Sequence, residues 1–492
     1  MFLAKKIFLP LRVNNNKSRE KVYIMTVVPM AWPSPVEAGS LTVHKFGGTS
    51  VGGADQFVQV CEIIGRLVRF NGEKPLVVVS AMAGITSKLY ECVSLASQGK
   101  DFGGILHAIL GRHIDCIHAL MSLGGLNAEN LIEVIKNDIA AISSTLVEES
   151  NKSHSSDLVS DKIVAFGEIW SSQILSELIS AAGIPSCWIN ARDFLFLLPS
   201  SDPVRVDWKR SQAPLIPTGI QVPVITGFLA TSADGLPTTL KRNGSDHSGA
   251  IVANLVGAKS LTIWTDVDGI YSADPRLVEN AKKLDFMSYK EAAELAYFGA
   301  KVIHPQTVAP CVRQSIPVIL RNTFNLSSQG TVISESRGLE IRAVTLIPKI
   351  ALVNVEGSGL FGFSGIAAKL FAAVAAAETN IIMITQASSE YSICFAIPEA
   401  DAHICAKAVK EIFASEIEEK SIEVSLDTAA IVAAVGDGMH RQRGLLGRLA
   451  SALGDAGVNI RALAQGSSER NITFVVSVED GVKALSRLHD VL

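Results

Sequence analysis

Residues 42–51 read Thr-Val-His-Lys-Phe-Gly-Gly-Thr-Ser-Val, a short strand pattern that ends in a lysine, two glycines and two hydroxyl side chains. A helical pattern of apolar residues follows over residues 55–64. Adjacent glycines let the backbone approach an anion, and the free amides that open the next helix supply donors with a favourable dipole. Lys45 adds a mobile positive charge. The pattern indicates a phosphate-binding loop, although a tight strand-to-helix turn with a solvated lysine has the same signature.

The 492-residue chain has the composition of a folded protein with two to four domains, since 48% of its residues are apolar. Its net charge of -4 argues against nucleic-acid binding. No run approaches the roughly 18 apolar residues that a membrane span requires. Seven scattered cysteines without a C-x-x-C pair argue against a disulfide framework or a zinc site and favour reduced thiols. We therefore predict small-molecule partners, no nucleic acid and no membrane.

The first 40 residues differ in composition from the rest. They carry six lysines and arginines but only two acids, Glu20 and Glu37, and three prolines interrupt regular structure after residue 28. A basic, acid-poor start is typical of a transit peptide, whereas a disordered extension or a start codon placed too early is at least as good an explanation. The expected location is the cytoplasm, or a plastid if this segment is a transit peptide.

Strands alternate with helices over most of the chain. Residues 75–80 read as a buried strand, and further strands are expected over residues 186–189 and 222–228. This alternation predicts an α/β domain with a parallel-rich sheet between helices, whose ligands lie beyond the carboxyl ends of the strands. The glycine pair and Thr86 both fall at such ends, although Thr86 on its own is better explained as a helix cap.

Three further segments concentrate polar side chains. Glu168 lies in a helix-rich region, where an exposed helix position is the ordinary role of a glutamate. Residues 238–246 form the densest polar loop, which supplies either a binding site or a cap for the next helix through Ser245 or Asp246. Residues 261–276 run from a strand into a turn with three aspartates, a tyrosine and an arginine, a composition that solvated turns also show.

An internal repeat follows Gly330. Residues 380–390 read NIIMITQASSE and recur 79 positions later, at residues 459–469, as NIRALAQGSSE. Each copy has a preceding strand, a glycine-led helix and a following strand, which with the next helix gives a βαββα order. The second copy lacks a final strand before Leu492, so either the chain is a fragment or that strand is supplied differently.

Taken together, these segments resemble the aspartate kinase family, most closely the kinase portion of the plant-type bifunctional enzymes that join aspartate kinase to homoserine dehydrogenase. The resemblance covers residues 41–492 and rests on five motifs: KFGGTS at 45–50, FGE at 166–168, RNGSD at 242–246, WTDVDGIY at 264–271 and FGAKV at 298–302. It implies an amino-acid kinase fold followed by two ACT-like βαββαβ domains. The expected divisions are an extension over 1–40, a catalytic domain over 41–335, and ACT domains over 345–426 and 427–492.

The resemblance does not reach a dehydrogenase, because the chain stops at Leu492, and residues 42–51 do not carry the dinucleotide fingerprint. What it implies is transfer of the γ-phosphoryl group of ATP, with Mg²⁺, to the side-chain carboxylate of L-aspartate. The product would be 4-phospho-L-aspartate, in the first step of lysine, threonine and methionine biosynthesis. A carboxylate nucleophile is already ionised at pH 7, so the chemical difficulty is to bring two anions together.

The same similarity assigns roles to individual residues, and it assigns none as a metal ligand. The expected roles are catalysis by Lys45 and Asp246; aspartate binding by Ser50, Thr86, Glu168, Arg242 and Ser245; nucleotide binding by Gly47, Gly48, Thr265, Asp266, Tyr271, Arg276 and Lys301; and effector binding by Gln386 and Gln465.

The effector implied by the resemblance is threonine, with lysine second, and the implied assembly is a homodimer or higher homo-oligomer. A structural hydrogen bond at a strand end is the alternative role of both effector-site glutamines. Two other functions compete with aspartate kinase. A kinase for glutamate or N-acetylglutamate is disfavoured by the paired ACT-like repeat. A non-catalytic amino-acid sensor is disfavoured because Lys45, Glu168, Arg242 and Asp246 are all retained.

Overall fold

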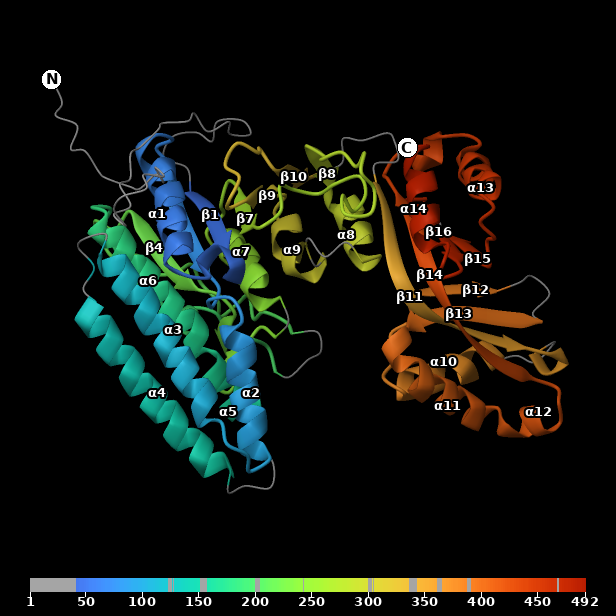
Figure 1. Cartoon of the computed structure of the whole chain (residues 1–492), viewed down its shortest axis with the longest axis horizontal. Helices are drawn as coiled ribbons and strands as arrows, with labels where there is room; N and C mark the ends of the chain where they lie inside the picture. Colours follow the sequence, from blue (N-terminus) through green and yellow to red (C-terminus); the bar gives the residue numbers. More distant parts are fainter. Residues whose placement is uncertain are drawn as a thin grey trace, which may run out of the picture. The chain divides into compact units, whose positions relative to one another are not determined.

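The computed structural model describes residues 41–492 apart from short segments, which are 123–125, 127, 151–156, 200–203, 242, 300–302, 304, 336–342, 361–364, 387–390 and 467–468. The basic segment 1–40 and the predicted site residues Arg242 and Lys301 lie outside the described residues. The described chain forms two compact units (Figure 1). The first comprises residues 41–268 and Gln306–Val332, and the second comprises Gly269–Pro305 and Ile333–Leu492.

The first unit is built on strands that pair in parallel in the order β3-β4-β2-β1-β7-β9. Their bounds are β1 (Leu41–Phe46), β2 (Lys74–Val79), β3 (Ser186–Ile189), β4 (Val222–Thr226), β7 (Leu261–Thr265) and β9 (Val318–Asn322). The central strands are almost fully buried and consist mostly of apolar and β-branched residues, as parallel strands covered on both faces require, although β1 also contains His44 and Lys45. The predicted parallel-rich α/β domain is confirmed.

Helices α1 and α6 pack together against this sheet, α7 packs against β1 and β7, and α2 to α5 form a further bundle. Their bounds are α1 (Ala54–Arg69), α2 (Ile85–Ser97), α3 (Gly103–Met121), α4 (Ala128–Ser150), α5 (Asp157–Val164), α6 (Phe166–Ala181), α7 (Gly244–Leu255) and α9 (Pro305–Val312). A separate two-stranded hairpin joins β5 (Leu229–Thr231) and β6 (Pro237–Thr239), and β10 (Thr331–Ser334) follows β9. None of the helices in the described ranges has both the length and the hydrophobicity that crossing a bilayer demands.

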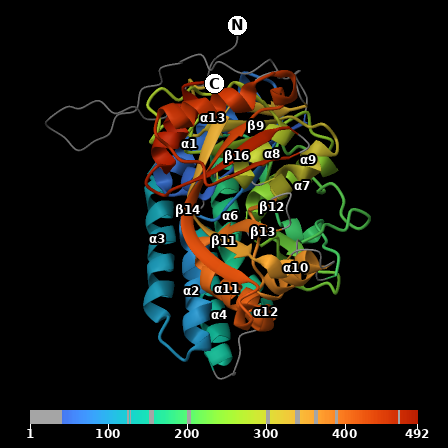
Figure 2. The ribbon, with the colours of Figure 1, turned by 90° about the vertical axis from the view of Figure 1, so that its right-hand side faces the viewer.

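The second unit is organised around two long strands, β11 (Ala343–Glu356) and β14 (Glu423–Val435), which pair antiparallel along most of their lengths (Figure 2). The pairing register shifts between Ile347 and Ile350, and this irregularity divides the sheet into two halves. In one half β11 also pairs with β13, and in the other β14 also pairs with β16. The full order is β12-β13-β11-β14-β16-β15.

This arrangement answers the question of the missing final strand. The second repeat begins at the latter half of β14, and its last strand is the stretch Ala343–Ile347 of β11, which precedes the first repeat in the chain. Each repeat therefore completes a βαββαβ unit by sharing a long strand with the other. The remaining elements are β8 (Phe286–Ser288), α8 (Tyr289–Tyr297), α10 (Ile366–Ala376), β12 (Met383–Gln386), β13 (Ser392–Pro398), α11 (Ala402–Ile412), α12 (Ala414–Glu418), α13 (Leu445–Asp455), β15 (Ala462–Gln465), β16 (Asn471–Val476) and α14 (Gly481–His489).

Residue alternation along the shared strands fills three cores. On β11, Val353 and Val355 face the core with α10 and α11, whereas Ile350 and Leu352 face a second core. That second core joins the two repeats and also contains Phe298, from the end of α8. Side chains on successive strand positions point to opposite faces. The stretches Ile350–Val353 of β11 and Ala429–Val435 of β14 are buried on both faces and are continuous apolar runs.

Residues 269–305 belong to the second unit although they come between two strands of the first. Phe298 packs in the core between the repeats, and the hydroxyl of Tyr297 donates to the carbonyls of Ile381 and Ile382 at 2.8 and 3.1 Å. Glu291 closes a capping box with Ser288 at the start of α8, and its Oε1 accepts the backbone N–H of Asp437 at 2.9 Å. This segment is therefore fastened to both repeats.

Candidate active site

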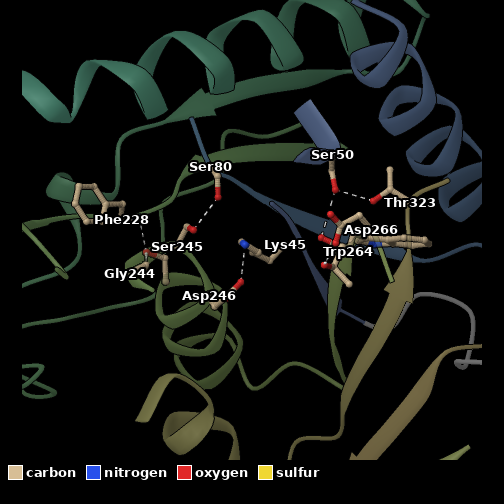
Figure 3. A network of polar contacts seen from close by, with 12 residues as sticks. Lys45, Ser50, Ser80, Phe228, Gly244, Ser245, Asp246, Trp264, Asp266 and Thr323 are labelled. Carbon is tan, nitrogen blue, oxygen red and sulfur yellow. Dashed lines mark hydrogen bonds and ion pairs between the residues drawn. The ribbon is translucent and has the colours of Figure 1, made fainter. Parts of the chain in front are cut away.

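Lys45 lies near the carboxyl end of β1 with its side chain buried, and its Nζ is 2.5 Å from Oδ1 of Asp246 in the first turn of α7 (Figure 3). A buried ammonium requires a partner of opposite charge. The helix reaches the lysine because it has a glycine at the contact: a Cβ on Gly249 would lie 3.1 Å from Cβ of Lys45. The sequence thus permits an ion pair between elements about 200 positions apart.

The glycine pair after β1 touches the loop after β2. The N–H of Gly47 donates to the carbonyl of Trp264 at 3.2 Å, and a Cβ on Gly48 would lie 3.0 Å from the carbonyl oxygen of Ala81. Arg112 of α3 fastens the two loops by donating to the carbonyls of Ala83 at 2.6 Å and Gly52 at 2.8 Å. The residues that would cradle a phosphate are therefore held by close backbone packing.

The first turn of α7 carries the polar groups that face this loop. Asn243, with φ +56°, is the N-cap and makes no side-chain cap, so the prediction that Ser245 or Asp246 caps the helix is wrong. The Oγ of Ser80, at the end of β2, donates to Oγ of Ser245 at 2.7 Å (Figure 3). Gly227 lies against the same turn, since a Cβ there would be 2.8 Å from both the Ser245 Cβ and the Val79 carbonyl oxygen.

Glu168 lies in the first turn of α6 and is 4% exposed, so the alternative of an exposed helix position is wrong. Burial raises the pKa of this carboxyl to about 8, and a backbone hydrogen bond from Ala81 and the positive charge of Lys45 oppose that rise. Its Oε2 is buried without a hydrogen-bond partner among the described residues. An unsatisfied buried carboxylate oxygen is suited to a cation brought by a ligand.

A second group of predicted residues gathers at the ends of β7 and β9. Ser50 is fully buried, and its Oγ is 2.7 Å from the hydroxyl of Thr323 (Figure 3). The N–H of Thr323 donates to the carbonyl of Thr265 at 2.8 Å, and the Thr265 hydroxyl donates to Asp266 at 3.2 Å. Ser50, which the resemblance assigns to aspartate, therefore lies with residues that it assigns to the nucleotide.

Three other predicted residues lie in α2 and in the second unit. Thr86 lies inside the first turn of α2, whose N-cap is Gly84, so its interpretation as a helix cap is wrong. Tyr271 and Arg276 belong to the second unit, and the exposed Arg276 pairs with Asp274 at 2.6 Å.

The two predicted effector residues occupy equivalent places in the repeats. Gln386 ends β12 and Gln465 ends β15, and these strands contact each other. Both side chains are exposed, and neither hydrogen-bonds to another residue within the described part of the chain. The alternative of a structural hydrogen bond at the strand end is therefore not seen there.

Several residues of the site were not predicted, including Ser80, Gly227, Phe228 and Thr323. Phe228 has φ +67° and donates its N–H to Oγ of Ser248 at 2.8 Å, which fixes the backbone beside α7. All four follow the carboxyl end of a strand: β2, β4 or β9. The signal that finds them is the rule that ligands of a parallel sheet bind at this edge.

Comparison with protein families matches residues 40–322 to the amino acid kinase family and residues 353–413 and 432–492 to the ACT domain. The chain belongs to the amino acid kinase family. The expected architecture of a kinase fold followed by ACT domains is thereby confirmed.

Among similar proteins, the chain is 39% identical to bifunctional aspartokinase/homoserine dehydrogenase 2, chloroplastic, of Arabidopsis thaliana, covering 91% of this chain and 50% of that one. It thus spans about half the length of the plant proteins of this kind that it matches. Its fold matches E. coli aspartokinase III solved with aspartate and ADP, with a TM-score of 0.74, 27% identity and coverage of 92% and 99% of the two chains. The same enzyme solved with lysine and aspartate gives 0.71, 26% and the same coverage.

Replacing Gly227 with alanine is expected to destabilise the first unit by about 1–3 kcal/mol, because the new methyl group would overlap a backbone carbonyl and the first turn of α7. Gly111→Ala is the matched control. Gly111 lies inside α3 with nothing within 4 Å of a new Cβ, so this change should stabilise the unit by roughly 0.5–1 kcal/mol.

Urea unfolding followed by tryptophan fluorescence measures this difference, since Trp170, Trp188, Trp208 and Trp264 lie in the first unit and the second unit has no tryptophan. Equal midpoints for the two variants would show that α7 does not depend on a glycine at position 227.

Proposed function

We propose that this protein is an aspartate kinase, which transfers the γ-phosphoryl group of ATP to the side-chain carboxylate of L-aspartate and gives 4-phospho-L-aspartate. The proposal rests on the buried Lys45–Asp246 ion pair, which lies beside the loops that follow β1 and β2 and pack closely against each other. The similarity of the fold to an aspartokinase solved with aspartate and ADP supports the choice of substrates.

In this proposal Lys45 interacts with the phosphoryl group that is transferred. Phosphoryl transfer to an ionised carboxylate needs positioning and charge neutralisation rather than a strong general base. The ammonium of Lys45 and the amides of the glycine loop would neutralise the transferred group, acting as preorganised donors at a site of developing charge. Asp246 holds the lysine in place before the substrates bind.

Glu168 is the group best suited to the ammonium of aspartate. Its free oxygen and its burial favour a cationic partner, and the pKa of about 8 means that this pairing requires loss of a proton at neutral pH. Ser245, fixed by Ser80, supplies a neutral hydroxyl in the same region. In the proposal Arg242, which precedes this turn in the sequence, pairs with a carboxylate of aspartate.

Mg²⁺ fits this site as an ion carried on the nucleotide. No cluster of three or more histidine, cysteine, aspartate or glutamate side chains suited to a metal occurs among the residues that the structure describes. Magnesium in kinases is held largely by phosphates and water with few protein carboxylates, so the absence of such a cluster is compatible with its use. When bound, the ion would neutralise phosphate charge.

The ACT repeats supply the regulatory part of the proposal. An amino-acid effector would bind at the ends of β12 and β15, where Gln386 and Gln465 are exposed. We favour threonine as the effector because the resemblance to the bifunctional enzymes implies it, and these enzymes are the more similar group. The Arabidopsis bifunctional enzyme is 39% identical to this chain, whereas the lysine-bound E. coli enzyme is 26% identical. Lysine is the second choice.

Assembly and location complete the proposal. A homodimer or higher homo-oligomer is expected from the resemblance, and sedimentation of the purified chain measures it. We place the protein in a plastid rather than the cytoplasm, because the plant relatives are named chloroplastic and residues 1–40 are basic and poor in acids.

The deciding experiment is ATP- and Mg²⁺-dependent phosphorylation of L-aspartate, with the acyl phosphate trapped as its hydroxamate. Product that depends on aspartate and is suppressed by threonine or lysine supports both parts of the proposal. Glutamate and N-acetylglutamate serve as competing substrates. Turnover of either in preference to aspartate, or no turnover by folded protein, would replace the proposal with the corresponding alternative.

Changing Lys45 to alanine is expected to lower kcat about 10²–10³-fold, since removal of a single preorganised donor to developing charge has effects of this size. Binding of the effector should be unchanged, because Lys45 lies in the first unit and the repeats in the second. Hydroxamate assays and calorimetric titration with threonine measure the two properties. Lys74→Ala, an exposed lysine that begins the neighbouring strand, is the control. If the Lys45→Ala variant turned over as fast as the Lys74→Ala control, Lys45 would have no role in the mechanism.

The pKa of Glu168 predicts a pH dependence. Because burial raises it to about 8, the carboxyl is protonated at neutral pH and becomes able to pair with the substrate ammonium as the pH rises through 8. We expect kcat/KM for aspartate to increase with pH up to about 8.

Glu168→Gln should abolish this rising limb and lower kcat/KM by about 10–100-fold, the value of one charge-assisted hydrogen bond. KM for ATP should change little. A rising limb that survives in the variant would assign the titration to another group.

A further inference from the structure

A carboxylate outside the predicted site holds the loop that leads into the first turn of α7. Asp161 lies in α5 and is 4% exposed. Its Oδ2 accepts the hydroxyl of Thr238 at 2.8 Å and its Oδ1 accepts the hydroxyl of Thr239 at 3.1 Å. Nζ of Lys241 lies 3.0 and 3.1 Å from the same two oxygens. One buried carboxylate thus binds three side chains of a four-residue stretch.

Other contacts also hold this stretch, since Thr239 and Leu240 are buried and the N–H of Leu240 donates to the carbonyl of Phe228 at 2.8 Å. Thr238 and Thr239 belong to β6, for which the described residues supply one pairing strand, β5, and two-stranded hairpins depend on outside contacts for their stability. A cavity of about 310 Å³ borders the same stretch and is lined in part by Asp161 and Lys241. On the side of the stretch that borders this cavity, the hydrogen bonds and the ion pair to Asp161 therefore hold the loop instead of packing.

The backbone here is also strained. Lys241 has φ +58° and Asn243 has φ +56°, although neither is glycine. Left-handed conformations cost a non-glycine residue roughly 1–2 kcal/mol each and persist only where surrounding contacts impose them. The Lys241 side chain is held by Asp161, and its carbonyl accepts the N–H of Gly244 at 3.1 Å, which closes the turn onto α7.

We propose that Asp161 is a positioning residue for the aspartate site. It anchors residues 238–241 and thereby sets the first turn of α7, which presents Ser245 and Asp246. Helix α5 ends at Val164, and α6 opens at Phe166 with Glu168 in its first turn. The carboxylate thus connects the segment bearing Glu168 to the segment bearing Ser245. This inference rests on the proposed function for its catalytic consequence but not for its structural one.

The test compares Asp161→Ala and Asp161→Asn with Asp157→Asn. Asp157 is an exposed aspartate one turn earlier on α5, so it controls for loss of one negative charge on that helix. Asp161→Ala should raise KM for aspartate about tenfold or more, because displacement of a binding group by about 1 Å has effects of this order. KM for ATP should stay within about twofold. Asp161→Asn keeps an acceptor but loses the charge and should fall between alanine and wild type.

Hydrogen–deuterium exchange without ligands gives a readout that does not need activity. Asp161→Ala should speed exchange of the amides over residues 237–248 and leave residues 74–80 of the neighbouring strand unchanged. Unchanged exchange over 237–248, or a KM for aspartate within about twofold of wild type, overturns the inference. So does a parallel loss of affinity for both substrates with faster exchange in both segments, which would mean general destabilisation. If the wild-type protein does not phosphorylate aspartate, the proposed function fails and the exchange comparison alone decides the role of Asp161.

Discussion

The ion pair between Lys45 and Asp246 is the contact on which the rest of the site depends. Taking an ammonium out of water costs several kcal/mol unless a well-placed partner compensates it. That requirement demands that α7 approach β1, which Gly249 permits, and that the first turn of α7 stay where Asp246 reaches the lysine. The tight contact at Gly227 and the anchoring by Asp161 both act on this turn or on the loop before it. The residues that the resemblance assigns to the substrate are thus placed by the same contacts that satisfy a buried charge.

Local sequence was enough to predict the elements whose cause is local. The strand patterns at the start of residues 42–51 and over residues 75–80 depend on neighbouring residues, and β1 and β2 occur there. The polar partners of the site could not be found this way. Ser80 bonds to a residue 165 positions away and Ser50 to one 273 positions away, so the pairs exist only once the sheet order is known. Of the sequence arguments, only the rule that ligands bind beyond the carboxyl ends of parallel strands pointed to the region where these residues lie.

Burial and strand sharing also lay beyond local patterns. A glutamate in a helix pattern is ordinarily exposed, and only the close contact between the start of α6 and the loop after β2 shows that Glu168 is buried; a Cβ on Gly167 would lie 2.8 Å from Cβ of Ala81. Likewise, residues 343–356 form one strand in the structure, yet its two halves complete different repeats because the register shifts between Ile347 and Ile350. Pairing partners are a property of the sheet.

The segment 269–305 gives the proposed feedback control a physical basis. It carries Tyr271 and Arg276, which the resemblance assigns to the nucleotide, yet Phe298 lies in the core between the two repeats and Tyr297 bonds to the carbonyls just before β12. Protein interiors are close-packed, so a displacement of β12 by an effector cannot be absorbed without moving what packs against it. In the proposal, a ligand at the end of this strand would therefore act first on the segment that carries Tyr271 and Arg276.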